Sequence, residues 1–157
     1  MNLKKLKPTK MEKIVSDSED EISIERAMSL RNEDKRKEAL EILIPLAQKY
    51  KNSSVLNGLI GMNYSELENH ELSAFYFKKT TRLNPNSELA SLGLFHSLWD
   101  LSKYKDAFKE MDNFLSKNKA KLYKVTLKEQ FEQLDDKTPK YQREILEKHS
   151  SQIKRRK

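Results

Sequence analysis

The chain has 157 residues and a formal net charge of +7, and 35% of its residues are charged. Three glycines and four prolines are too few for the many tight turns of a sandwich or barrel, so composition favours helices. The absence of cysteine excludes disulfides, thiolate zinc sites and a cysteine nucleophile. No apolar stretch approaches the roughly 18 residues of a membrane span. The basic start also lacks the apolar core of a secretory signal, so we expect a cytoplasmic protein.

The positive charge is concentrated at the two ends of the chain. Residues 1–15 hold five lysines and one glutamate, and we expect them to form a basic, flexible N-terminal segment. Residues 16–121 are close to neutral, whereas residues 122–157 are basic again. A basic tail is most often solvated, but it can also contact a polyanion or a membrane surface. The weak candidates for polyanion contact are the last four residues, Lys154, Arg155, Arg156 and Lys157.

Residues of similar size recur every 34 positions along the middle of the chain. Small residues recur at Ala39, Ser73 and Ala107. Bulky residues recur in the same phase, at Leu43, Phe77 and Met111, and again at Leu30, Tyr64 and Leu98. A period of this length predicts one helical hairpin used three times, with each copy burying its apolar face against the next.

These residues resemble the tetratricopeptide repeat (TPR) family. The pattern is fullest in residues 54–87, which carry Ile60, Gly61, Tyr64, Ser73, Phe77, Thr80 and Pro85. Residues 20–53 and 88–121 keep its small and bulky positions. The resemblance implies an all-α fold, a short right-handed α-solenoid of three TPR-like hairpins within residues 16–121. Residues 122–157 would then supply C-terminal capping helices and a basic tail.

Local signals predict where some helices begin and bend. Ser18, with Glu21 three residues later, has the pattern of a capping box at the start of the first helix. Pro45 falls inside the apolar run 39–47, where a proline removes a hydrogen bond and crowds the preceding turn. That helix must kink there or break near Ile44, and we expect a kink. Thr138 followed by proline predicts the N-cap of a last helix.

Candidates for catalysis or metal binding are scarce. His70, His96 and His149 lie far apart and lack the i, i+4 spacing of a helical metal site. The glycines fall within helical patterns, so no phosphate-binding loop is expected. We therefore predict no catalytic residues, no metal, no cofactor and no enzymatic activity.

The TPR resemblance implies that the first helix of each hairpin lines a concave groove. The predicted groove residues are Ile24, Met28, Arg31, Val55, Met62, Leu89, Leu92, His96 and Trp99. Most are apolar, whereas a solvated helix face is normally polar, so the groove is a candidate site for a partner peptide. Alternatively, the C-terminal helices fold back and fill the groove, which makes Trp99 part of the core. A carboxylate clamp of the kind found in chaperone-tail adaptors is not expected, because Ile24, Met28 and Met62 occupy its places.

The sequence therefore indicates a non-enzymatic protein–protein interaction module that binds a segment of one partner. Two narrower readings stay open, a chaperone similar to those of type III secretion translocators and an immunity protein that neutralises a toxin or effector. An alternative of a different functional class is nucleic-acid binding through the basic ends of the chain. The near-neutral middle and the lack of an aromatic-basic recognition motif argue against that alternative. The chain is expected to be a monomer or a homodimer, with no membrane span.

Overall fold

A computed structural model describes residues 15–153, which form eight α-helices and one short 3₁₀ helix. Their bounds are α1 (Ser18–Asn32), α2 (Arg36–Lys49), α3 (Ser54–Glu66), α4 (His70–Leu83), α5 (Glu88–Asp100), α6 (Tyr104–Leu115), α7 (Tyr123–Glu132), α8 (Lys140–His149) and the 3₁₀ helix η2 (Ser150–Gln152). The described residues contain no strand, and the expectation of an all-α fold is confirmed.

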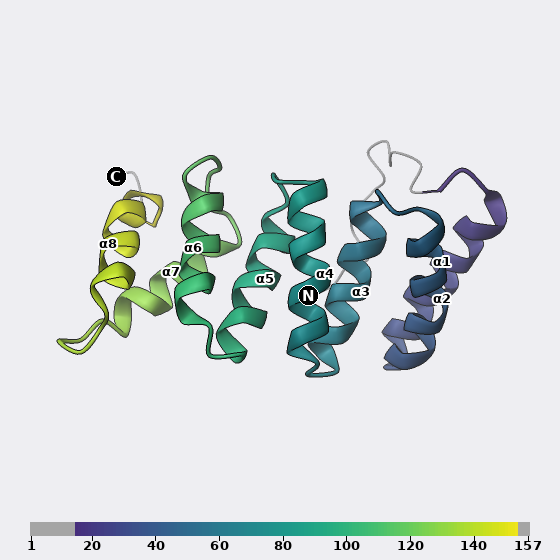
Figure 1. The fold of residues 1–157 in the computed structure, drawn as a ribbon, viewed down its shortest axis with the longest axis horizontal. Helices are drawn as coiled ribbons and strands as arrows, with labels where there is room; N and C mark the ends of the chain where they lie inside the picture. The colour runs from purple at the N-terminus through teal and green to yellow at the C-terminus, as the bar shows by residue number, and fades with distance from the viewer. Residues whose placement is uncertain (1–14, 154–157) are drawn as a thin grey trace.

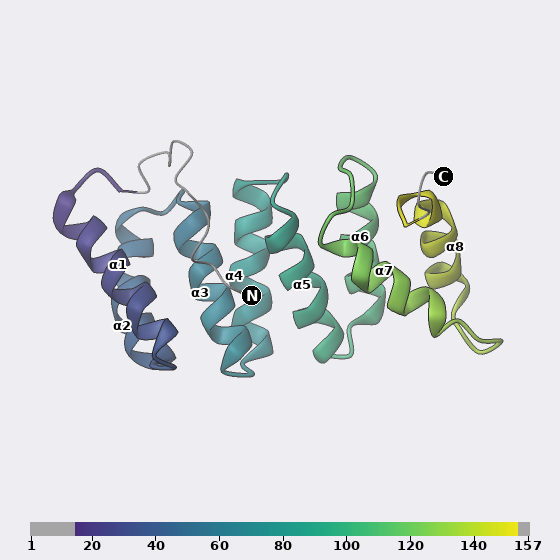
Figure 2. The ribbon, with the colours of Figure 1, turned by 180° about the vertical axis from the view of Figure 1, so that it is seen from behind.

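Helices α1 to α6 form three antiparallel hairpins that stand side by side in one row (Figure 1). Helices α2, α4 and α6 lie toward the viewer in Figure 1, and α1, α3 and α5 lie toward the viewer in Figure 2. Helices α7 and α8 extend the row at its C-terminal end. This is the predicted fold class, a helical-repeat solenoid of three hairpins with C-terminal capping helices. The residue limits of the three repeats stay a prediction.

The same turn joins the two helices of every hairpin. Asp34, Glu68 and Ser102 have left-handed backbones, with φ values of 63°, 57° and 58°. After each of them, an amide donates to a carbonyl five residues earlier: Lys35 to Leu30 at 2.9 Å, Asn69 to Tyr64 at 2.9 Å and Lys103 to Leu98 at 2.8 Å. Left-handed conformation costs a non-glycine residue about 1 kcal/mol, so the hydrogen bonds and the packing of the hairpins must offset that cost.

Phe77 of α4 packs between the first helices of the second and third hairpins, α3 and α5. Its side chain is 4% exposed, and the ring lies over two glycines, Gly61 of α3 and Gly93 of α5. A Cβ atom at Gly61 would lie 3.2 Å from the ring, and one at Gly93 would lie 2.6 Å from it. Nearby, the buried Ser73 hydroxyl donates to the Gly61 carbonyl at 3.1 Å and lies 2.8 Å from the Ser97 hydroxyl. The small residues of the repeat thus permit close helix contact.

The core consists of two large clusters and a small one between them. The first is built from α1 to α3 and includes Val15, Ile24, Leu43, Leu56 and Ile60. The second joins α5 and α6 to the C-terminal helices and includes Phe95, Phe108, Met111, Tyr123, Leu127 and Leu146. The small cluster contains Phe77, Ala90 and Leu94. Apolar burial therefore runs along the whole stack, as expected when no hairpin can bury its own face.

Tyr123 and Glu88 attach the start of α7 to α5. The Tyr123 ring is fully buried, and its hydroxyl lies 3.0 Å from the hydroxyl of Ser91, which donates to Glu110 at 2.7 Å. One carboxylate oxygen of Glu88 accepts from the amides of Lys121 and Tyr123, at 2.7 and 2.9 Å. A carboxylate suits this place because the first amides of a helix lack partners within the helix.

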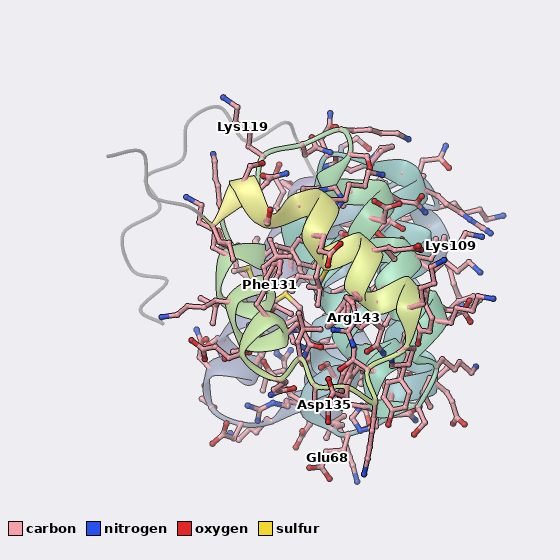
Figure 3. All side chains as sticks on the ribbon, turned by 90° about the vertical axis from the view of Figure 1, so that its left-hand side faces the viewer. Glu68, Lys109, Lys119, Phe131, Asp135 and Arg143 are labelled. Atoms are coloured by element: carbon pink, nitrogen blue, oxygen red, sulfur yellow. The ribbon has the colours of Figure 1, made fainter. Side chains whose placement is uncertain are left out.

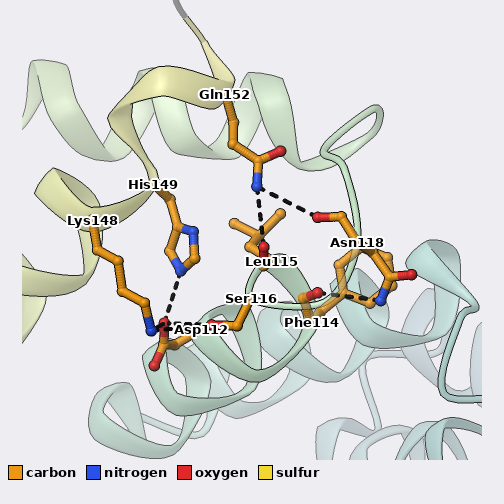
Figure 4. A network of polar contacts seen from close by, with 8 residues as sticks. All are labelled: Asp112, Phe114, Leu115, Ser116, Asn118, Lys148, His149 and Gln152. Carbon is orange, nitrogen blue, oxygen red and sulfur yellow. Dashed lines mark hydrogen bonds and ion pairs between the residues drawn. The ribbon is translucent and has the colours of Figure 1, made fainter.

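A polar network holds α8 against α6. The Asp112 carboxylate accepts from Lys148 and His149, both at 2.7 Å, and Gln152 donates to the Leu115 carbonyl at 3.1 Å (Figure 4). Figure 3 looks onto this end of the stack, with α8 in front and Phe131 of α7 beside it. The C-terminal helices are thus fixed to the end of the stack.

Two local predictions, both of N-cap residues, need correction, and one of the two outcomes considered for Pro45 is excluded. The N-cap of α1 is Asp17 rather than Ser18, and its carboxylate accepts from the Glu19 amide at 2.9 Å. Thr138 does not cap α8, because its hydroxyl accepts from the Asp135 amide at 2.9 Å and closes the preceding loop. Helix α2 does not break at Pro45 but continues to Lys49, with Pro45 exposed on its surface.

Candidate functional site

An apolar cleft opens between α3 and α5, near the N-terminal ends of these helices. Its volume is about 230 Å³. Residues of α3, α4 and α5 line it, together with the loop between α4 and α5. The lining residues are Ser54, Val55, Gly58, Leu59, Met62, Phe77, Thr80, Asn84, Ser87, Leu89 and Ala90. None of them is charged, so this space, hereafter the α3–α5 cleft, suits an apolar side chain.

Three of the predicted groove residues meet in the α3–α5 cleft. Val55 and Leu89 stand at its edges and are 45% and 52% exposed. Met62 is half-buried and packs on the small core cluster around Phe77. Gly58 has no side chain and leaves space above Thr80, since an added Cβ would lie 3.7 Å from the Thr80 methyl group. Apolar side chains at such exposure gain free energy when a partner removes them from water.

The predicted groove residues of α1 lie outside the cleft and differ from one another. Ile24 is 5% exposed and belongs to the first core cluster, so it is not available for a partner. Met28 is 46% exposed and stays accessible. Arg31 is largely buried and forms an ion pair with Glu66 of α3, whose carboxylate also binds Arg36 of α2. The guanidinium is thereby used to join the first two hairpins.

Leu92, His96 and Trp99 of α5 also lie outside the cleft. Leu92 and Trp99 are half-buried and pack against the second core cluster. The Trp99 ring stacks on Phe95 at a centroid distance of 5.8 Å and meets Tyr104 edge-on at 4.8 Å. The tryptophan predicted to anchor a partner therefore packs largely in the core. The alternative in which C-terminal helices fill the groove does not apply to the α3–α5 cleft, because no lining residue comes from α7 or α8.

His96 is the only histidine of the predicted groove, and it lies on the surface beside α7. Desolvation lowers the pKa of His96, while the negative charges of Asp100 and Glu129 act in the opposite direction. The lowered pKa makes the ring predominantly neutral at pH 7. His96 therefore adds no lasting positive charge to this face.

Sequence reasoning missed the floor of the cleft. Phe77 and Thr80 of α4 form it, and Leu59 of α3 adds a wall. The prediction considered only the first helix of each hairpin, although the second helix fills the space between successive first helices. The recurrence of Phe77 and Thr80 in the repeat phase was a usable signal, because interlocking residues must lie next to that gap.

Charge differs sharply between the two sides of the stack. Helices α3 and α5 carry no lysine or arginine, and their only charged residues at neutral pH are Glu66, Glu88 and Asp100. Helices α2, α4 and α6 together carry eight lysines and arginines. On α1, the exposed Glu21 and Glu25 add two carboxylates, against one exposed cation, Arg26. The face formed by α1, α3 and α5, hereafter the α1/α3/α5 face, is thus apolar and acidic in a chain that is basic overall.

The remaining predictions concern metal binding, membrane spans and the basic ends of the chain. Within residues 15–153, no three histidine or acidic side chains gather in a way that could hold a metal ion. No helix in that range combines the length and apolar character needed to cross a membrane. The basic N-terminal residues 1–14 and the candidate polyanion contacts Lys154, Arg155, Arg156 and Lys157 lie outside the described residues.

The stacked hairpins and their shared turn define a TPR-like helical-repeat solenoid, the class of scaffold on which the α3–α5 cleft lies. The fold is similar to a crystal structure of the Sgt2 TPR domain from Aspergillus fumigatus, with a TM-score of 0.59 and 13% sequence identity. The likeness covers 90% of this chain and 83% of that one. No family model matches the sequence, and neither does any curated protein. The likeness therefore establishes the fold, a helical repeat.

Proposed function

We propose that this protein is a non-enzymatic interaction module that binds a segment of another protein along the α1/α3/α5 face. The α3–α5 cleft receives one apolar side chain of that segment. The observation that carries the proposal is the uncharged cleft of about 230 Å³, with Val55 and Leu89 half-exposed at its edges. A leucine or phenylalanine side chain that enters such a space contributes about 1.5–3 kcal/mol when it is fully buried, before the cost of ordering the segment.

The exposed Met28 on α1 extends this surface beyond the cleft. It is 46% exposed, and its flexible thioether adapts to differently shaped partners. Trp99 is not part of the proposed contact, since it packs on Phe95 and Tyr104. The translocator-chaperone, immunity-protein and nucleic-acid alternatives have no supporting observation of their own within residues 15–153.

Peptide selection with the full chain tests this function. The bait is the wild-type protein, and the comparison bait carries Val55→Glu and Leu89→Glu at the edges of the cleft. Both positions are exposed on helices, so the fold should tolerate glutamate, and circular dichroism verifies the helix content. The expected result is that selected peptides bind the double variant at least about tenfold more weakly than the wild type.

Phe75→Glu is the matched control. Phe75 is exposed on α4 but is not among the residues that line the cleft. Its replacement removes apolar surface and adds one negative charge elsewhere on the protein, half of what the double variant adds, so affinity should stay within about twofold of wild type. Equal affinity for the wild type and the double variant would contradict the proposed function.

A further inference from the structure

We infer that the segment bound by the α1/α3/α5 face belongs to a partner that is both apolar and basic, with lysine or arginine residues beside its apolar anchor. This inference rests on the proposed function and adds the chemistry of the partner. It follows from the distribution of charge around the cleft rather than from the cleft itself, which carries no charge.

Few cations lie on the α1/α3/α5 face. The chain has 31 lysines and arginines, yet α3 and α5 have none along their whole length. The groove arginine on α1, Arg31, is neutralised by its ion pair with Glu66. Desolvation lowers the pKa of His96, which disfavours the charged form of this ring. An acidic segment would therefore find little cationic charge on α3 and α5 to bind.

Carboxylates lie at several places on or beside the same face. Glu21 and Glu25 are exposed on α1, and Asp100 is about half-exposed at the end of α5. Glu129 of α7 lies close enough to His96 to influence its titration, which places a further carboxylate at the C-terminal side of the face. A basic segment that binds along this face would meet carboxylates contributed by α1, α5 and α7. Complementary charge of this kind raises the association rate and selects between partners.

The C-terminal ends of α3 and α5 lack the basic residues that helix ends usually carry. Helices usually place cations in the last turn, where the macrodipole is negative. The last turns of α3 and α5 contain no basic residue, and of their terminal carboxylates Glu66 is paired with Arg31 and Arg36, whereas Asp100 is about half-exposed. The negative end of the α5 dipole thus adds to the Asp100 carboxylate. A cation supplied by the partner would favour this end of the face.

The test uses a random peptide library displayed on phage, with the full chain as bait. The expected result is enrichment of peptides with net positive charge around an apolar residue. Affinity for the best such peptide should fall at least about tenfold when its lysines and arginines are replaced by glutamate. It should also weaken between about 50 and 500 mM salt, because the charges are exposed and screened. Enrichment of neutral or acidic peptides that still require Val55 and Leu89 would overturn the inference and leave the proposed function intact.

Matched variants of the chain locate the charge effect. Glu25→Gln with Glu129→Gln removes one carboxylate from α1 and one from α7 beside the α1/α3/α5 face, and we expect at least about fivefold weaker binding of the basic peptide. Glu41→Gln with Glu147→Gln removes two exposed carboxylates from α2 and α8 and should change affinity by less than about twofold. Equal losses in the two variants would overturn the inference, because net charge alone would then explain the preference.

The chain's own first residues are the competing occupant, since residues 1–14 are themselves rich in lysine. Replacing Lys4, Lys5 and Lys7 with glutamate in the full chain distinguishes the two cases. Unchanged affinity for the basic peptide supports a separate partner. An increase of about tenfold or more would show that the N-terminal segment competes for the face, and would overturn its assignment to another protein.

Discussion

Replacing Gly93 with alanine should destabilise the protein, although alanine is the better helix former. Within a helix, alanine is favoured over glycine by about 1 kcal/mol. At Gly93, however, the new Cβ would lie 2.6 Å from two atoms of the Phe77 ring, well inside van der Waals contact. The ring has little freedom to move away, because it is 4% exposed and is also in tight contact with Gly61. Overpacking costs about 1–3 kcal/mol, and a contact this short belongs to the upper part of that range, about 2–3 kcal/mol, so the net effect is a loss of about 1–2 kcal/mol.

Gly58 provides a control with the same chemical change in a similar helix. An alanine Cβ at Gly58 would lie 3.7 Å from the Thr80 methyl group, which is ordinary contact. Gly58→Ala should therefore stabilise the protein by up to about 1 kcal/mol. The two variants should differ by about 2–3 kcal/mol, which corresponds to melting temperatures about 5–10 °C apart for a chain of this size.

Urea and thermal unfolding followed by circular dichroism measure both variants. Shortening the ring partner, with Phe77→Leu in the Gly93→Ala background, should cost less than the sum of the two single changes, by about 1 kcal/mol. A Gly93→Ala protein as stable as the wild type or as Gly58→Ala would refute the argument. It would show that the Phe77 ring is not held between the two glycines.

Three further changes probe the turns, the C-terminal cap and the core. Glu68→Gly should raise the free energy of unfolding by about 0.5–1 kcal/mol in urea titrations, because it removes a left-handed non-glycine residue; no gain would mean that the turn is not strained. Burial alone would raise the pKa of Asp112, but hydrogen bonds from Lys148 and His149 hold that pKa below its usual value. The stability that Asp112 contributes is therefore present above about pH 4 and lost as pH falls through the folded pKa. Asp112→Asn should thus destabilise the protein at pH 7 by about 1–2 kcal/mol and much less at pH 3, and equal losses at both would contradict the ion pairs. Burial raises the pKa of Tyr123, so an absorbance titration should leave this tyrosine protonated until the protein unfolds, with stability declining above about pH 10; ionisation of all six tyrosines in the folded protein would refute its burial.

The fold class was predictable because its signals are local and repeated. The recurrence of Ala39, Ser73 and Ala107 marks positions where paired helices come close, and all three are buried. The left-handed turn residues Asp34 and Glu68 recur with the same spacing, although neither is a glycine. Repetition makes weak single signals additive, so the hairpin could be recognised even though no one copy is strong evidence.

The ends of individual helices were less predictable. Asp17 and Ser18 are both good N-cap residues, and the choice between them depends on the backbone angle at which the chain enters the helix. Pro45 left two outcomes open, a kink or a break, and α2 runs on to Lys49 without a break, while the expected kink stays a prediction. The packing of Leu46 and Ala47 in the first core cluster supplies a reason, since it stabilises the turn that follows the proline.

The sequence by itself determined the hairpin, its number of copies and the residues of the α1/α3/α5 face. These features depend on periodicity along one chain. The tertiary structure alone decided which residues of that face are accessible. Ile24 and Trp99 have the same apolar character as Val55 and Leu89, but the first two are packed against other helices and the last two border an open cleft. Exposure depends on which neighbouring helix covers a residue, and that is set by the stacking of segments far apart in the chain.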